Sequence, residues 1–148
     1  MKNILFLCTG NSARSIMAEA YMNHTGAGRW RAYSAGSTPT GKINPFALET
    51  LAAHGVTAPD SLYRSKSWDE FAAPGAPIMD VVITVCDNAA GETCPIWPAR
   101  NDKSPQKLHW SFPDPAAVEG DDAQKRVAFE KVFADIRALI DAFLAQSA

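Results

Sequence analysis

Two short, continuous runs of apolar residues stand out along the chain. The first is Ile4 to Leu7, within the segment Lys2 to Leu7, and the second lies within the segment Asp80 to Val85. Runs of about four to eight apolar residues bounded by turn-forming residues are typical of strands that are buried on both faces of a parallel sheet. We therefore predict two central strands, each followed directly by a cysteine, Cys8 and Cys86.

Three other segments have apolar residues at helical spacing. Ser15 begins the first, which we expect to end near Gly26 and Gly28; residues 44–54 form the second, with a proline in its first turn. Residues 121–146 form the third, and the spacing of their apolar residues predicts a long amphipathic helix.

Weaker patterns complete the prediction. Residues 29–34 and 107–110 read as shorter strands, while residues 57–78 read mainly as loop, with a possible short helix over 68–73. Strands alternating with helices indicate an α/β fold: one domain over residues 1–148, with a small parallel sheet, helices on both faces and right-handed crossovers.

The composition narrows the functional classes. The chain has 148 residues, of which 47% are hydrophobic and 20% charged, and its net charge is −2. This balance argues against partners recognised through overall positive charge, such as nucleic acid or a membrane surface. The first apolar run is too short for a signal peptide or a membrane span, so we expect a cytoplasmic protein.

Cysteine usage points to working thiols. Three cysteines, Cys8, Cys86 and Cys94, are an odd number in a chain with no export signal, which favours reduced thiols over a disulfide framework. The three histidines follow no zinc-ligand spacing, so a zinc site is a poor interpretation.

The segment CTGNSARS, residues 8–15, has the features of an anion-binding loop. Gly10 and Asn11 tolerate left-handed backbone angles, so successive N–H groups can turn inward around a tetrahedral oxyanion. The following helix adds its positive end, and the guanidinium of Arg14 can hold two oxygens. These groups should lower the pKa of Cys8 and make it a nucleophile. We expect the oxyanion to contact Thr9, Gly10, Asn11, Ser12, Ala13, Arg14 and Ser15.

The alternative is that Cys8 is a small buried residue at a strand end and Arg14 lies on the solvent face. A cysteine and an arginine at this spacing alone would favour that interpretation. The strand before them, the glycine and asparagine between them and the helix after them favour a nucleophile in an anion site.

Four motifs together resemble the low-molecular-weight tyrosine phosphatase family and its arsenate reductase branch. They are CTGNSARSxMAE from residue 8, YSAG from residue 33, VCDNAAGETCPIWP from residue 85 and HWSFPDPA from residue 109. The resemblance implies that Cys8 is the nucleophile, Arg14 the oxyanion clamp and Asp114 the general acid. Ala13 departs from the family, because many members have a second cysteine there.

Asp114 shows how much the resemblance adds. The residue lies between Pro113 and Pro115, which restrict the backbone and could fix a carboxyl group beside the loop. From the residues alone an ordinary Asp-Pro turn is the better interpretation. The resemblance instead implies that Asp114 protonates the oxygen that leaves arsenic or phosphorus.

The two later cysteines fit a relay. If the strands before Cys8 and Cys86 are neighbours, about 4.8 Å apart, their thiols nearly meet, although the loop after Cys86 must shift for a disulfide to form. Cys8 would attack arsenate, Cys86 would attack Cys8, and Cys94 would carry the disulfide outward. Taken singly, Cys86 and Cys94 could equally be packed structural residues. This pattern resembles the thioredoxin-coupled arsenate reductases.

The same resemblance implies further ligands and competing functions. No cofactor is required, but a potassium ion could be held by Asn11, Glu19, Ser34 and Asp69; otherwise these are loop hydrogen-bonding groups and surface charges. The substrate would be arsenate, with phosphate or sulfate competing, and the reductant thioredoxin or another thiol.

A protein tyrosine or small-molecule phosphatase is the main alternative. Alanines follow the Asp-Pro pair where phosphatases of this fold commonly have a tyrosine. A non-catalytic anion-binding or redox-sensing module is a third possibility.

Overall fold

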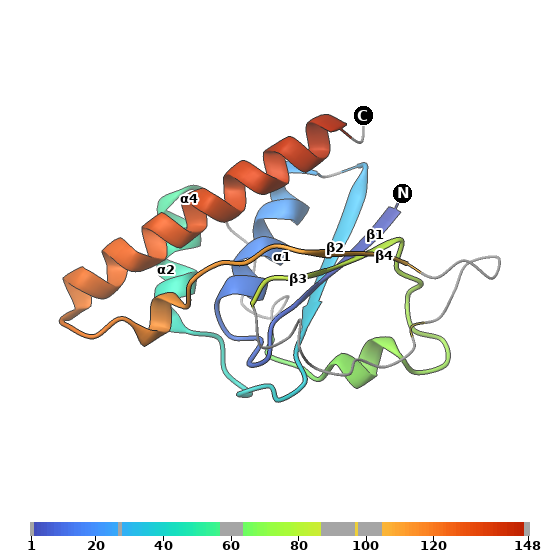
Figure 1. The fold of residues 1–148 in the computed structure, drawn as a ribbon, viewed down its shortest axis with the longest axis horizontal. Coiled ribbons are helices and arrows are strands. Elements are labelled where there is room, and N and C mark those ends of the chain that lie inside the picture. Colours follow the sequence, from blue (N-terminus) through green and yellow to red (C-terminus); the bar gives the residue numbers. More distant parts are fainter. Residues whose placement is uncertain (1, 27, 57–63, 87–96, 98–104, 147–148) are drawn as a thin grey trace.

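The computed structural model describes residues 2–26, 28–56, 64–86, 97 and 105–146. Its centre is a four-stranded, fully parallel sheet in the order β2-β1-β3-β4 (Figure 1). The strands are β1 (Lys2–Leu7), β2 (Trp30–Ala35), β3 (Val81–Thr84) and β4 (Gln106–His109). The two continuous apolar runs form the two central strands, as their sequences predict.

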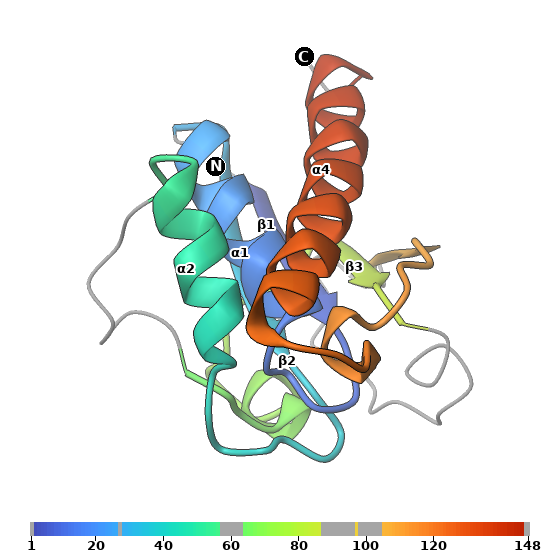
Figure 2. The ribbon, with the colours of Figure 1, turned by 90° about the vertical axis from the view of Figure 1, so that its left-hand side faces the viewer.

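Three α-helices pack on one face of the sheet and on one another (Figure 2). They are α1 (Arg14–Thr25), α2 (Pro45–Ala53) and α4 (Asp122–Gln146). Each lies within a residue or two of its predicted position. The side chain of Asn44 caps α2 by accepting a hydrogen bond from the backbone N–H of Phe46. None of the helices in the described ranges is long and apolar enough to cross a bilayer.

The two faces of the sheet carry separate cores because side chains alternate along a strand. Ile4 and Phe6 of β1 point to the face covered by the three helices. Leu5 and Leu7 point to the other face, where they pack with the 3-10 helix η2 (Trp68–Phe71). The parallel α/β fold with helical cover on both faces is therefore confirmed, with α-helices on one face and a short 3-10 turn on the other. A second 3-10 turn, η3 (Pro115–Ala117), precedes α4.

This topology sets the position of the site. β1 and β3 are hydrogen-bonded neighbours, with Leu7 paired to Thr84. Because both strands run in the same direction, the residues that follow them lie together at one edge of the sheet. Ligands bind at this edge in parallel sheets, so Cys8 and Cys86 reach it from adjacent strands.

Candidate active site

The loop between β1 and α1 is held open by its neighbours. The carbonyl oxygens of Thr9, Gly10 and Ser12 accept hydrogen bonds from three backbone N–H groups of residues 38–44, at 2.8 to 3.1 Å. A further bond to the Gly10 carbonyl comes from the hydroxyl of Ser65 at 3.1 Å. These bonds fix the loop carbonyls on the side of residues 38–44. The N–H of Asn11 donates to the Cys8 carbonyl oxygen, so the oxyanion site depends on the other amides of the loop and on the start of α1.

Asn11 makes the loop turn back on itself. It is the non-glycine residue with a positive φ, 45°, among the described residues, whereas Gly10 does not adopt a left-handed angle. Of the two residues that tolerate a left-handed angle, Asn11 is the one that adopts it. The Asn11 side chain is fully buried; it donates to Ser15 Oγ at 2.8 Å and accepts from the Lys66 backbone N–H at 2.9 Å. These two bonds hold a conformation that costs an L-residue free energy.

Helix α1 begins one residue earlier than predicted, at Arg14. Its N-cap, Ala13, has no side-chain hydrogen-bonding group, and the first turn has no acidic residue. Ser15, which the sequence suggested as the helix start, accepts instead from Asn11. The N-terminal amides of α1 and the positive end of its dipole are thus directed at the loop without a competing carboxylate.

Arg14 and Asp114 face each other across the loop. Arg14 Nη1 donates to the carbonyl oxygen of Phe112 at 2.9 Å, and its Nη2 lies 3.9 Å from Asp114 Oδ2. Asp114 Oδ1 also accepts from the backbone N–H of Ala116 at 3.0 Å, so this residue caps the turn η3. Asp114 is therefore both an Asp-Pro turn residue and a carboxylate beside the loop arginine; the two interpretations are compatible.

Cys86 lies directly against the loop. Its Sγ accepts a hydrogen bond from the backbone N–H of Thr9 at 3.4 Å, and its thiol lies close enough to Cys8 to act on the pKa of that residue. Both thiols are free and buried. The hydrogen bond to Cys86, followed by burial, raises the pKa of Cys8, while the positive charge of Arg14 and the amide of Gly10 act in the opposite direction. The prediction of a lowered pKa for Cys8 was therefore wrong for this arrangement of the two thiols.

The raised pKa has a simple origin in the pairing. Two thiols in contact can share one negative charge, but the second ionisation brings two thiolates together in a buried site. The positive charge of Arg14 lowers the pKa of Cys8 and so acts against the effects of Cys86 and of burial. Cys94, the third cysteine of the predicted relay, lies outside the described residues.

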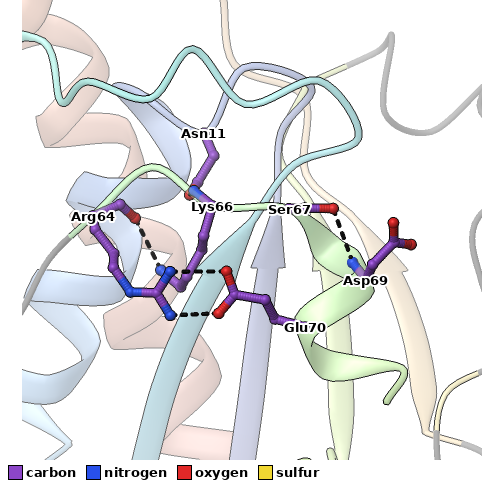
Figure 3. Close-up of polar contacts among 6 residues, drawn as sticks. All are labelled: Asn11, Arg64, Lys66, Ser67, Asp69 and Glu70. Carbon is purple, nitrogen blue, oxygen red and sulfur yellow. Dashed lines mark hydrogen bonds and ion pairs between the residues drawn. The ribbon is translucent and has the colours of Figure 1, made fainter.

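The four predicted potassium ligands do not all converge. Asn11, Glu19 and Ser34 are buried, and Ser34 Oγ donates to Glu19 Oε1 at 2.6 Å. Asp69 is exposed at the start of η2, and its carboxylate points away from Asn11 (Figure 3). Burial raises the pKa of Glu19 to about 7, although Lys66, the Ser34 hydroxyl and Arg64 oppose the rise.

Two residues of the site went unnoticed in the sequence. Lys66 is buried beside Glu19 and supports Asn11 from behind. Gly36 lies so close to the loop that a Cβ there would overlap the carbonyl oxygens of Cys8 and Thr9. Only the position of Gly36 within the YSAG motif could have indicated its role, and a single lysine in a loop usually indicates a solvated charge.

Residues 3–148 match the family model described as low molecular weight phosphotyrosine protein phosphatase. The chain belongs to this family, which agrees with the cysteine-arginine loop, the helix behind it and the aspartate beside it.

Arsenate reductases are among the similar proteins. The arsenate reductase of Shouchella clausii (strain KSM-K16) is 36% identical over 142 residues, which cover 96% of this chain and 94% of that protein. A structure described as an arsenate reductase in the phosphate binding state is 25% identical, covers both chains completely and has a TM-score of 0.71.

A thioredoxin-dependent arsenate reductase from Corynebacterium glutamicum is also similar. It is 26% identical, with a TM-score of 0.65, over 99% of this chain and 63% of that chain. This chain therefore matches somewhat less than two thirds of the length of that protein.

Proposed function

We propose that this protein reduces arsenate to arsenite. The observation that carries the proposal is the contact between the thiols of Cys8 and Cys86 at the edge of an anion-binding loop. A phosphatase needs one nucleophilic cysteine in such a loop, but it has no use for a second thiol against the first. The relatives named as arsenate reductases, which align over almost the whole chain, support the same function.

The first step joins sulfur to arsenic. The Cys8 thiolate attacks arsenate held by the loop amides and Arg14, and a sulfur-arsenic bond forms. The bond from arsenic to a hydroxyl group of hydrogen arsenate breaks, and that hydroxyl leaves as water after taking a second proton from Asp114. Asp114 Oδ2 lies 3.9 Å from Arg14 Nη2. The proton donor, Asp114, is therefore beside the residue that binds the anion, Arg14.

The second step transfers electrons to arsenic. The Cys86 thiolate forms a bond to Cys8 Sγ, the sulfur-arsenic bond breaks and its electron pair stays on arsenic. Arsenic passes from the +5 to the +3 state and leaves as arsenite, while the two sulfurs are oxidised to a disulfide. Cys86 lies beside Cys8 at the end of the neighbouring strand, so the attacking thiol comes from the sheet edge that holds the anion loop.

The third step regenerates the nucleophile. Cys94 attacks Cys86, releases the Cys8 thiolate and leaves a disulfide that an external dithiol can reduce. Thioredoxin is the reductant we favour, because one similar protein is named thioredoxin-dependent. Phosphate and sulfate, which have the same tetrahedral shape, should compete with arsenate. A relay of reduced thiols suits a reducing compartment such as the cytoplasm.

The function can be tested by comparing two reactions in three proteins. The parent should show arsenate-dependent oxidation of thioredoxin and little hydrolysis of an aryl phosphate. Cys86→Ser should lose the first reaction while keeping any hydrolysis, since it retains the loop and the acid. Cys94→Ser should release about one equivalent of arsenite per chain and stop, with a Cys8 to Cys86 disulfide visible by mass spectrometry.

Two results would contradict the proposal. Rapid hydrolysis of the aryl phosphate, unaffected in Cys86→Ser and accompanied by no arsenite, would make the protein a phosphatase. Continued turnover in Cys94→Ser would remove Cys94 from the relay and leave Cys86 as the only resolving thiol.

A further inference from the structure

A buried lysine stands among the groups that the family resemblance assigns to a metal ion. The side chain of Lys66 is only 7% exposed, and its Nζ donates to the carbonyl oxygen of Arg64 at 3.0 Å (Figure 3). Its ammonium interacts electrostatically with the carboxylate of Glu19, and both residues line one cavity of about 500 Å³. Lysine is almost never buried to this extent without a partner.

The backbone of Lys66 connects this charge pair to the anion loop. Its N–H donates to Asn11 Oδ1 at 2.9 Å, and its carbonyl oxygen accepts from the Gly36 N–H at 3.0 Å. Asn11 carries the left-handed turn of the loop, and Gly36 abuts the carbonyl groups of Cys8 and Thr9. The backbone of Lys66 therefore hydrogen-bonds to two residues, Asn11 and Gly36, that determine the conformation of the loop.

A metal cation does not fit this set of residues. Asp69 is exposed and points away from Asn11, so it does not join the other three residues. The charged side chains lining the cavity include three bases but only two acids, and one acid, Glu70, is paired with Arg64 through both carboxylate oxygens. An added cation would be repelled by the ammonium and the guanidinium groups around it. The charged residues that line the cavity are Glu19, Arg31, Arg64, Lys66 and Glu70.

We propose that the ammonium of Lys66 is a permanent internal cation that takes the place of a potassium ion here and positions the anion loop through Asn11 and Gly36. The ammonium lowers the pKa of Glu19 and so partly offsets the effect of its burial, and the bonds of the Lys66 backbone fix the loop. Lys66 touches neither the substrate nor the reacting sulfurs; it is a positioning residue. Lys66 would position the loop in the same way for arsenate reduction and for phosphate hydrolysis, because both reactions require the loop to bind an anion.

The first experiment measures the affinity of the parent protein for inorganic phosphate by calorimetry. Titrations in potassium chloride and in tetramethylammonium chloride at equal ionic strength should agree within about twofold, and the thermal unfolding midpoint should be the same in both salts. A phosphate affinity or unfolding midpoint that rises specifically with potassium would overturn the proposal, because it would show that a metal ion is used.

The second experiment removes the ammonium. Lys66→Met keeps the length and the backbone bonds but leaves Glu19 as an unpaired buried carboxylate, so phosphate affinity should fall on the order of tenfold, the size of one lost charge-assisted interaction. Potassium, but not tetramethylammonium, should restore part of the loss by entering the vacated position. Lys131→Met, at an exposed position on α4, is the matched control and should behave as the parent in both salts.

A double variant guards against simple unfolding. Glu19→Gln with Lys66→Met removes both buried charges, so this protein should fold more stably than Lys66→Met alone and should show no response to potassium. Unchanged phosphate affinity in a folded Lys66→Met protein, or a potassium response in the double variant, would refute the assignment of Lys66 as the internal cation.

Discussion

The backbone N–H of Thr9, the first amide after the nucleophile, donates to the Sγ of Cys86 at 3.4 Å. The second thiol thus occupies the rim of the anion loop and contacts Cys8 from there. Cys86 is both the group that opposes ionisation of Cys8 and, in the proposed reaction, the group that attacks it.

This contact predicts the behaviour of Cys86→Ala. The variant lacks the largest cause that raises the pKa of Cys8, while the opposing effects of Arg14 and the Gly10 amide remain. The alkylation of Cys8 by iodoacetamide should therefore reach its half-maximal rate at a lower pH than in the parent. Peptide mass spectrometry can follow Cys8 separately from Cys94. An unchanged pH profile would mean that Cys86 does not control the ionisation of Cys8.

Replacement of the nucleophile gives the second prediction. Cys8→Ser should lose both arsenate reduction and any phosphatase activity, because a hydroxyl group is not ionised near neutral pH. The fold should survive, since the change is nearly isosteric and Cys8 contributes one small side chain to the core. Turnover of arsenate is measured together with the circular dichroism spectrum. A folded variant that still turns over would exclude Cys8 as the nucleophile.

Asp114 can be tested with two variants that separate its roles. Asp114→Asn keeps the oxygen that accepts from the Ala116 N–H, so the turn η3 should persist while proton donation is lost. The first step should slow by about 10²- to 10⁴-fold in single-turnover experiments. Asp114→Ala loses the cap as well and should unfold more easily by about 1 kcal/mol. Equal rates for Asp114→Asn and the parent would leave Asp114 with the cap alone.

Gly36→Ala should damage the loop from outside it. The new methyl group overlaps the carbonyl oxygens of Cys8 and Thr9, which are backbone atoms and cannot move aside without distorting the loop. Phosphate binding and arsenate reduction should both be lost, with a decrease in the free energy of unfolding of several kcal/mol. Gly28→Ala, where the φ is 86° and nothing lies within 4 Å of the added group, is the control. That variant should lose about 1 kcal/mol and keep its activity.

The raised pKa of Glu19 predicts that the free energy of unfolding depends on pH. Burial raises its pKa from 4.5 to about 7, so the folded protein holds this proton over a pH range in which the unfolded chain has released it. The contribution of this proton to the free energy of unfolding is about 3 kcal/mol; it is complete below pH 4.5 and is lost as the pH rises through 7. Glu19→Gln should lack this slope. Denaturant unfolding of both proteins at several pH values gives the difference, and parallel curves would show that Glu19 titrates normally.

The sequence predicts the fold better than the surroundings of the loop. The runs at 4–7 and 81–85 can be buried on both faces only in a central parallel strand, and this pattern places Cys8 and Cys86 at one edge. The support of the loop depends on contacts between residues far apart in the chain. Lys66 binds Asn11 across 55 positions, and no local pattern indicates that contact.

Asp69 and Gly10 show two further limits. The segment before Asp69 has no periodic pattern, so the sequence cannot fix which carboxylate of this region faces the loop. A glycine can adopt a left-handed backbone angle, but Gly10 does not have to adopt one. The hydrogen bond from the Thr40 N–H to the Gly10 carbonyl fixes the peptide in another orientation, and the turn falls to Asn11.

The hydrogen bonds that the loop carbonyls accept from residues 38–44 have a consequence for protein engineering. The octapeptide CTGNSARS does not fix its own conformation, because three of its carbonyl oxygens are hydrogen-bonded to a segment after β2. Grafting this octapeptide onto a foreign strand-helix junction would transfer the nucleophile and the arginine without the receptor that they serve. A transplantable unit must contain residues 36–44 as well, so that it is a pair of facing backbone segments rather than a linear motif.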